Sequence, residues 1–245
     1  MITFPLSEVE ESFKPDDLVP ITIQKVKNPV TNNFVDKYII HVNGDSFGLF
    51  SGRYVYCSTK GLVDKLKNYN LVNKTYSNGF LTVYLEHKEQ AKVFELNESE
   101  LKALLLLRPE LENLNKEVTS GIFITNSYTG TSKLSIGNYI KISGNEDVFV
   151  KYYVANQKTI HISSITSTVE NLEAFEISIE DVKKIDPVYF ESLLPLSKKK
   201  LEELKAHARN VMPYNTLHLL IILSQIAPNS MEEIGKIVSK FLNKD

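Results

Sequence analysis

Apolar and polar residues alternate most clearly between Gly121 and Ile142, where the pattern predicts two antiparallel strands joined by a short turn. The turn falls on Tyr128-Thr129-Gly130-Thr131-Ser132, a polar link that contains glycine. One face of the first strand carries Ile122, Ile124, Asn126 and Tyr128. One face of the returning strand carries Leu134, Ile136, Ile140 and Ile142. This hairpin is the predicted centre of a sheet that the rest of the chain extends or covers.

Similar patterns predict further strands on both sides of this hairpin. Asn43-Gly44 and Asn78-Gly79 are typical of tight hairpin turns, because asparagine and glycine tolerate the positive φ that such turns require. The additional strands are predicted over residues 21–26, 34–42, 46–50, 53–56, 80–86, 148–154 and 159–165.

Helical spacing and capping residues predict the helices. Asn97 followed by Glu100 forms a capping box at the start of the clearest helix. Leu217–Ala227 is apolar but too short to span a bilayer, so it predicts a buried helix. The other helices are predicted over residues 7–13 and 59–69, after Ser178, after Ser197, and after Ser230 with Glu233 as a second capping box.

Together these elements predict an α+β fold with a mainly antiparallel sheet, helices packed on one side and a small helical C-terminal region. The composition becomes helical after about residue 169, and Pro187 disfavours helix at the preceding residue. We therefore expect an α+β main domain over residues 1–185 and a helical C-terminal region over residues 186–245.

Composition restricts the environment more than the activity. The chain has 245 residues, 42% of them hydrophobic, 24% charged, and a net charge of -2, as in an ordinary globular protein. Cys57 is the single cysteine, so neither an intramolecular disulfide nor a multi-cysteine zinc site can form. The N-terminal residues lack the basic and apolar regions of a signal peptide. We expect a soluble protein of the cytoplasm, or of the host cytoplasm for a viral protein.

No pattern of catalytic residues stands out. The five histidines lack the spacing of a helical zinc site, and the serines lack the nucleophile elbow of a hydrolase. Cys57 would need a lowered pKa and a nearby histidine to act as a nucleophile. The sequence favours a non-catalytic protein without cofactor or metal; an enzyme would require a site assembled from distant residues.

Positive charge and tyrosine occur together in the predicted strands. Residues 1–20 carry a net charge of -4, whereas residues 21–94 carry +5 and residues 121–168 carry +2. Many tyrosines in the two positive segments adjoin a base, as in Arg53-Tyr54 and Lys151-Tyr152. Aromatic faces that stack bases and cations that follow phosphates are typical of single-strand binding. Tyrosine and lysine are also common strand and edge residues, so a purely structural role stays open.

Part of the chain resembles a known family. The residues that carry the resemblance are Phe50-Ser51-Gly52-Arg53-Tyr54 before a short helix, Gly79–Leu85, and the run Ile124-Thr125-Asn126-Ser127-Tyr128-Thr129-Gly130-Thr131-Ser132-Lys133-Leu134. Over about residues 45–145 the chain is similar to uncharacterised phage- and plasmid-borne proteins described as phage/plasmid-like. The resemblance implies a mobile-element setting, where single-strand binding or annealing is a reasonable expectation, and implies no catalytic residue.

The leading hypothesis is therefore a non-catalytic, homo-oligomeric protein of a virus or plasmid that binds single-stranded nucleic acid, DNA in particular, away from membranes. The alternative is a structural or self-assembling interaction protein without nucleic-acid affinity, which would use a sheet edge or the helical tail. The expected nucleic-acid contacts are Arg53, Tyr54, Lys133, Tyr139, Lys141, Lys151 and Tyr152.

Overall fold

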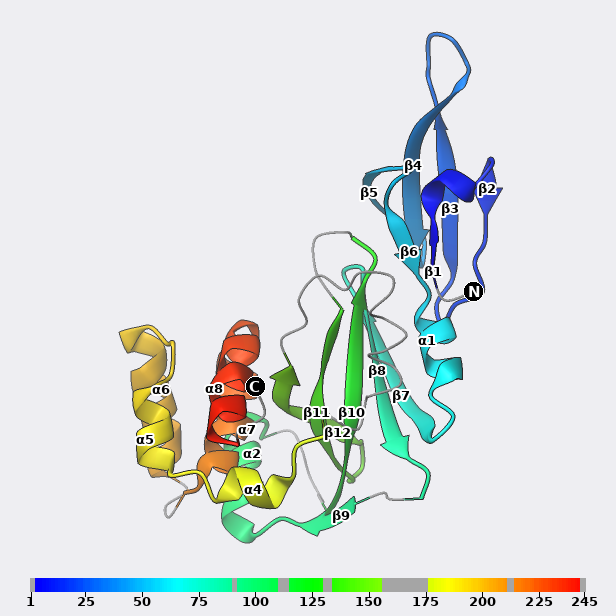
Figure 1. Cartoon of the computed structure of the whole chain (residues 1–245). Coiled ribbons are helices and arrows are strands. Elements are labelled where there is room, and N and C mark those ends of the chain that lie inside the picture. The colour runs from blue at the N-terminus through cyan, green and yellow to red at the C-terminus, as the bar shows by residue number, and fades with distance from the viewer. Residues whose placement is uncertain are drawn as a thin grey trace. The chain divides into compact units, whose positions relative to one another are not determined.

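The computed structural model describes residues 3–89, 92–109, 115–129, 134–155, 176–210 and 214–242. Within these ranges antiparallel sheets are combined with helices that gather toward the C-terminus (Figure 1). The predicted α+β fold class is confirmed.

The strands form three sheets. Their orders are β2-β3-β4-β5, β1-β6 and β12-β11-β10-β8-β7, and β9 pairs with β10 outside the last path. The strands are β1 (Thr3–Pro5), β2 (Ser12–Phe13), β3 (Ile21–Lys27), β4 (Phe34–Val42), β5 (Asp45–Ser51), β6 (Val55–Cys57), β7 (Tyr69–Ser77), β8 (Phe80–His87), β9 (Lys92–Glu95), β10 (Glu117–Ser127), β11 (Ser135–Ile142) and β12 (Val148–Ala155).

Helix α1 lies between β6 and β7 and helix α2 between β9 and β10, and the other described helices follow β12. The helices are α1 (Thr59–Lys65), α2 (Glu98–Leu107), α4 (Ile179–Lys183), α5 (Pro187–Ser192), α6 (Lys198–Arg209), α7 (Thr216–Ile226) and α8 (Met231–Phe241). Two 3-10 turns, η1 (Leu6–Glu8) and η3 (Pro228–Ser230), complete the described elements.

The chain divides into two compact units. Unit 1 comprises Met1–Leu85, Ile124–Leu134 and Gln157–Leu172, and unit 2 comprises Glu86–Phe123, Ser135–Asn156 and Glu173–Asp245. Residues on both sides of the expected domain boundary at 185/186 therefore belong to unit 2. The expected division into a main domain and a helical C-terminal region stays a prediction.

Unit 1 is built on the β3–β4 hairpin. Ile21 and Ile23 face Val42 and Ile40 across the hairpin, and all four side chains are buried. The turn after β4 has φ values of 56° at Asn43 and 93° at Gly44, as the sequence predicted. The loop between β3 and β4 projects beyond β2 and β5 (Figure 1).

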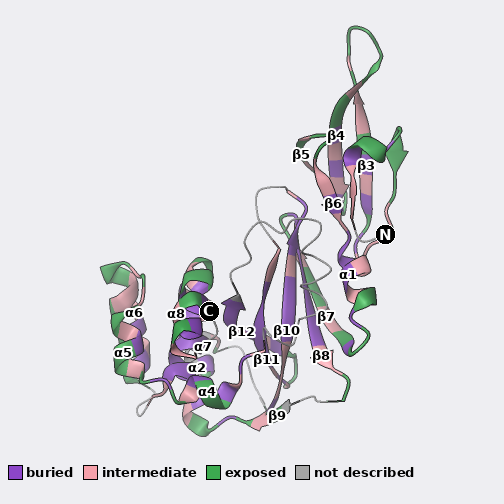
Figure 2. Cartoon of the chain, viewed as in Figure 1, coloured by how far each residue is buried: buried purple, intermediate pink, exposed green. Residues whose placement is uncertain are grey.

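Unit 2 packs helices on β12. The side chains of α7 are almost all buried, and both α7 and α8 contact β12 (Figure 2). Gly235 of α8 makes the close approach possible, because a Cβ there would lie 2.1 Å from the carbonyl oxygen of Val154. The predicted buried helix near the C-terminus is thus confirmed.

The start of α2 confirms the predicted capping box. The backbone N–H of Glu100 donates to Asn97 Oδ1 at 2.9 Å, and the N–H of Asn97 donates to Glu100 Oε2 at 3.0 Å. Glu100 is fully buried, pairs with Lys183 at 3.1 Å and accepts a hydrogen bond from Asn215 Nδ2 at 3.1 Å. This carboxylate therefore joins α2 to α4 and to the start of α7.

Several local expectations are wrong. Residues 7–13 form no α-helix. Ser7 and Glu8 belong to the 3-10 turn η1, and the flanking chain pairs with other segments: Ser7 N donates to Gly52 O at 3.0 Å and Phe13 faces Ile23. The helix predicted over residues 59–69 ends at Lys65, since Tyr69 begins β7.

The second predicted capping box is also wrong. Ser230 occupies the N-cap position of α8 but already has helical angles, φ -94° and ψ -4°, and its side chain makes no capping hydrogen bond. The strand predicted over residues 159–165 lies outside the described residues.

Candidate functional site: an acidic aromatic pocket

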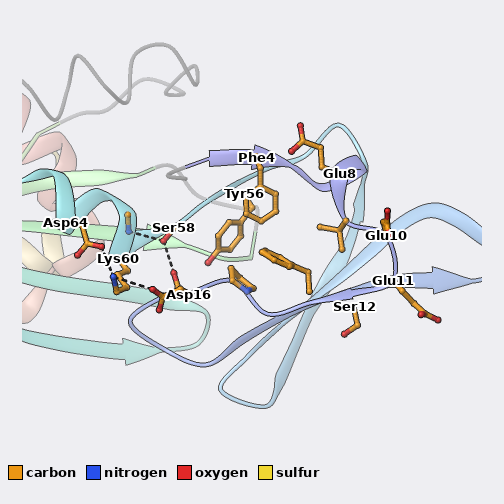
Figure 3. Close-up of a pocket in the computed structure, with 14 residues that line it drawn as sticks. Phe4, Glu8, Glu10, Glu11, Ser12, Asp16, Tyr56, Ser58, Lys60 and Asp64 are labelled. Atoms are coloured by element: carbon orange, nitrogen blue, oxygen red, sulfur yellow. Dashed lines mark hydrogen bonds and ion pairs between the residues drawn. The ribbon is translucent and has the colours of Figure 1, made fainter.

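Unit 1 contains a cavity of about 660 Å³ near the N-terminus (Figure 3). Its walls come from β1, η1, β2, the loop after β2, the end of β6 and helix α1. The lining residues are Phe4, Glu8, Val9, Glu10, Glu11, Ser12, Phe13, Pro15, Asp16, Tyr56, Ser58, Lys60, Gly61 and Asp64. This volume lies within the usual range of ligand pockets, about 300–1,000 Å³.

Strand pairing on two sides positions the walls. Phe4 of β1 lies opposite Tyr56 of β6, and Phe13 of β2 lies opposite Ile23 of β3. Between these strands the chain turns through η1, where Leu6 is fully buried. The glutamates that follow η1 are held at the surface around the opening.

Aromatic rings form the middle of the pocket. Phe4 meets Phe13 edge-on, with ring centroids 5.5 Å apart and an interplanar angle of 86°. The Phe4 and Tyr56 centroids lie 5.1 Å apart. The Phe13 side chain remains 44% exposed, which is high for a ring of this size and leaves a face for a ligand.

Carboxylates surround these rings. Figure 3 shows Glu8, Glu10 and Glu11 at one end of the pocket and Asp16, Lys60 and Asp64 at the other. The lining thus has five carboxylates and one ammonium group. An aromatic surface with this excess of negative charge attracts cations and repels phosphates.

Lysine neutralises only part of this charge. Lys60 Nζ lies 2.6 Å from Asp64 and 3.4 Å from Asp16, and hydrogen bonds to these two carboxylates raise the pKa of its ammonium group. Glu8 and Glu10 form no ion pair within the part of the chain that the structure describes. The end of the pocket with the glutamates therefore keeps its negative charge.

Behind the pocket, Asp17 fixes Tyr56 and helix α1. The Tyr56 hydroxyl donates to Asp17 Oδ2, and the Tyr128 hydroxyl donates to the same oxygen at 3.0 Å. The first N–H groups of α1 also donate to this carboxylate, Thr59 N at 3.2 Å and Lys60 N at 2.9 Å. The positive end of the α1 dipole therefore strengthens the attraction between α1 and the Asp17 carboxylate.

The network continues to the end of β10. Asn126 Nδ2 donates to Cys57 O at 2.9 Å and to Thr59 Oγ1 at 3.0 Å, and Thr59 Oγ1 lies 2.7 Å from the Tyr128 hydroxyl. Two residues of the predicted central hairpin thus reach α1. The sequence pattern places Asn126 and Tyr128 on one face of the predicted hairpin and counts Asp17 only in the negative charge of residues 1–20, and no local signal indicates their meeting.

The Cys57 thiol and the Tyr56 hydroxyl behind the pocket are held in their neutral forms. Burial, and then the Asp17 carboxylate, raise the pKa of Cys57 to about 12 and raise the pKa of the Tyr56 hydroxyl still further above its ordinary value. Cys57 is therefore a thiol near neutral pH rather than a nucleophilic thiolate. This part of the site offers hydrogen-bond donors and apolar surface.

The expected nucleic-acid contacts are distributed over both units. In unit 2, Tyr139 and Lys151 are opposite each other on β11 and β12, and Lys141 lies on the same side of β11. Lys141 pairs with Glu86 at 3.2 Å, and Lys151 lies 4.4 Å from the centroid of the Phe123 ring. Burial lowers the pKa of Lys151 to about 8.

The rings expected to stack bases in unit 2 are covered. Tyr139 is fully buried, and Tyr152 is 1% exposed with its hydroxyl donating to Ile177 O at 2.6 Å. Neither ring presents a face to a base in this conformation, because the strands that carry them are packed on both sides.

The remaining expected contacts belong to unit 1. Arg53 is exposed, and the half-buried Tyr54 packs on Phe50 with centroids 4.5 Å apart. Burial raises the pKa of Tyr54 to about 12. Lys133 lies outside the described residues. The described members of the expected set therefore do not form one exposed aromatic and basic face.

The described residues contain no group of three or more His, Cys, Asp or Glu side chains placed to hold a metal ion. Among the same residues, no helix combines the length and the apolar character needed to cross a membrane. Comparisons with protein-family models, curated proteins and solved structures found no match. The resemblance to phage/plasmid-like proteins stays a prediction.

Proposed function

We propose that this chain is an interaction protein whose acidic aromatic pocket binds a positively charged protein segment with an apolar or aromatic side chain. The observation that carries this proposal is the composition of the cavity, in which aromatic rings are surrounded by five carboxylates and one lysine. The proposal belongs to the second of the two functional classes that the sequence indicated.

The pocket supports both parts of such a ligand. A cation over an aromatic face contributes about 0.5–1 kcal/mol at an exposed site and about 2 kcal/mol when water is excluded. The exposed part of Phe13 and the half-buried Phe4 provide apolar surface, and the buried Tyr56 ring supports Phe4 from behind. Glu8 and Glu10 provide charge that no described cation neutralises.

The Tyr56 wall of the pocket is held rigidly, which favours binding by a preformed site. Tyr56 is fixed by its hydroxyl bond to Asp17 and by packing against Phe4. A wall that is already ordered loses little conformational entropy when the ligand arrives. The neutral thiol and hydroxyl behind the pocket suit recognition better than nucleophilic chemistry.

Binding of single-stranded nucleic acid stays a second proposal. The positive charge of residues 21–94 and the exposed Arg53 support it, whereas the burial of Tyr139 and Tyr152 removes two of the expected stacking rings. A labelled oligonucleotide that shows no binding at about 50 mM salt, where phosphate contacts are strong, would exclude this proposal.

The pocket is tested by fluorescence anisotropy with a labelled peptide of alternating lysine and phenylalanine. Glu8→Lys with Glu10→Lys should weaken binding at least about tenfold, since two attractions become repulsions. The matched control is Glu146→Lys with Glu202→Lys, which reverses two exposed carboxylates of unit 2. Equal affinity of the pocket and control variants would exclude the pocket as the binding site. A peptide with glutamate in place of lysine should not bind.

A further inference from the structure

The tip of the β3–β4 hairpin consists of the loop and the strand residue on each side of it, residues 27–34, and hydrogen bonds within the loop order it. Asn28 N donates to Asn33 O and Asn32 N donates to Asn28 O, each at 2.8 Å. The Asn28 side chain accepts hydrogen bonds from Val30 N at 2.8 Å and Thr31 N at 3.2 Å. These bonds fix the loop in one shape, as asparagine commonly does in turns.

This tip presents apolar and positive groups together. Val30 is 90% exposed and Phe34 is 39% exposed. Lys27 Nζ lies 4.7 Å from the centroid of the Phe34 ring, and residues 25–37 carry a net charge of +2. The tip therefore has the chemistry that the acidic pocket is proposed to bind.

The tip and the pocket belong to one continuous surface of unit 1. A groove of about 400 Å³ beside the hairpin is lined by Lys27 and Phe34, and it shares Glu11 and Ser12 with the pocket. Lys27 Nζ lies 3.7 Å from Glu11, and these side chains are 48% and 69% exposed. Both charged groups remain accessible to a partner.

Lys27 at the base of the tip reaches Glu11 at the edge of the pocket, but the end of the tip cannot fill the pocket of its own chain. Ser12 beside the pocket is opposite Gln24 of β3, and Val30 follows six residues later. Those residues carry the chain up to about 20 Å from the pocket wall at the rise of an extended strand. Bending the hairpin back would break its pairing with β4.

We propose that the hairpin tip of a second copy of this chain occupies the acidic pocket, and that the second pocket takes the first tip in return. This inference rests on the proposed function, because it names the partner of the same pocket. Charge complementarity supports it, since the tip is basic and the pocket acidic. Complementary patches side by side on one surface can pair reciprocally around a two-fold axis.

The test is sedimentation velocity on the full chain over a concentration series up to about 200 µM. We expect a reversible dimer of twice the 27.9 kDa chain mass. Glu8→Lys with Glu10→Lys should prevent dimerisation, and so should Lys27→Glu with Val30→Glu. Circular dichroism melting curves should show that both variants keep the fold.

Mixing the two variants sharpens the test. Each variant alone opposes like charges where the tip meets residues 8 and 10. The mixture instead pairs the lysines at positions 8 and 10 of one pocket with a negative tip, and an acidic pocket with a positive tip. The mixture should therefore dimerise, and the control Glu146→Lys with Glu202→Lys should dimerise as the natural chain does. A dimer unaffected by both variants, or a mixture that stays monomeric, would overturn the inference.

The inference and the proposed function fail differently. Val30→Glu alone leaves Glu11 and its partner Lys27 in place, so the affinity of this single tip variant for the lysine and phenylalanine peptide measures pocket binding with the competing tip altered. Peptide binding by this variant, with a natural chain that is monomeric at every concentration, would overturn only the dimer. Absence of peptide binding would overturn both.

Discussion

The two units each fix the start of a helix with one carboxylate, but they do so in different ways. In unit 2, Glu100 lies in the first turn of α2. Its carboxylate accepts a hydrogen bond from Asn97 N, three residues away, and also pairs with Lys183. In unit 1, Asp17 accepts hydrogen bonds from the first turn of α1, 42 and 43 residues away, and from two tyrosine hydroxyls.

The difference lies in how each negative charge is compensated. Glu100 has a cation within 3.1 Å and is fully buried. The hydrogen bonds that Asp17 accepts come from tyrosine hydroxyls and from the backbone N–H groups at the positive end of a helix, all of them neutral donors. Within the described chain, no lysine forms an ion pair with Asp17. The acidic site beside Asp17 therefore keeps its overall negative charge. This explains how one unit can be ordered by a carboxylate and still present an acidic pocket.

The largest expected effect comes from removing the paired carboxylate. Glu100→Ala leaves the Lys183 ammonium, with a side chain only 20% exposed, without its carboxylate partner. Breaking a buried pair in this way costs about 3–5 kcal/mol. Urea unfolding measures the loss. The control Glu98→Ala removes a neighbouring carboxylate that is 88% exposed and should cost less than about 1 kcal/mol.

A smaller loss is expected in unit 1. Asp17→Ala leaves two tyrosine hydroxyls and two helix N–H groups without this acceptor, and we expect a loss of about 2–3 kcal/mol because part-buried donors lose their partner. The same unfolding assay applies, with Asp16→Asn as the exposed control. A loss for Asp17→Ala that matches the control would mean that Asp17 does not organise the start of α1.

The smallest effect is a pH dependence confined to unit 2. His218 is 1% exposed, and burial lowers its pKa despite the nearby Glu100 carboxylate, with Lys183 acting in the same direction as burial. Its Nδ1 accepts a hydrogen bond from Asn215 N at 2.9 Å, while its Nε2 has no hydrogen-bond partner within the described chain.

Since the folded state favours neutral His218, the unfolded state binds more protons below its ordinary pKa of about 6.5. This contribution to stability is complete above about pH 6.5 and is lost as the pH falls through the lowered folded pKa. His218→Asn keeps an acceptor near the Nδ1 position and removes the titration. Melting temperatures between pH 7 and 5 should therefore decline less for this variant. An unchanged decline would assign the acid sensitivity to other groups.

The tyrosines show most directly that the exposure of a side chain could not be predicted from the sequence pattern. Arg53-Tyr54, Tyr139-Ile140-Lys141 and Lys151-Tyr152 have a similar local pattern, an aromatic ring within two residues of a base in a predicted strand. Their exposures differ because Tyr139 and Tyr152 are covered by packing, while Arg53 stays at the surface. Alternation along a strand assigns residues to two faces, but it cannot tell which faces other elements cover.

The sequence by itself determined the features that depend on neighbours within a few residues. These are the asparagine-glycine turns, the capping box at Asn97, the apolar helix near the C-terminus and the α+β class. Only the tertiary structure decided that Asp17 meets Tyr128, 111 residues away, and that β1 and β2 enclose an aromatic pocket with acidic edges. Local backbone chemistry selects turns and caps directly, whereas contacts between distant segments depend on how whole elements pack, and no short pattern records that packing.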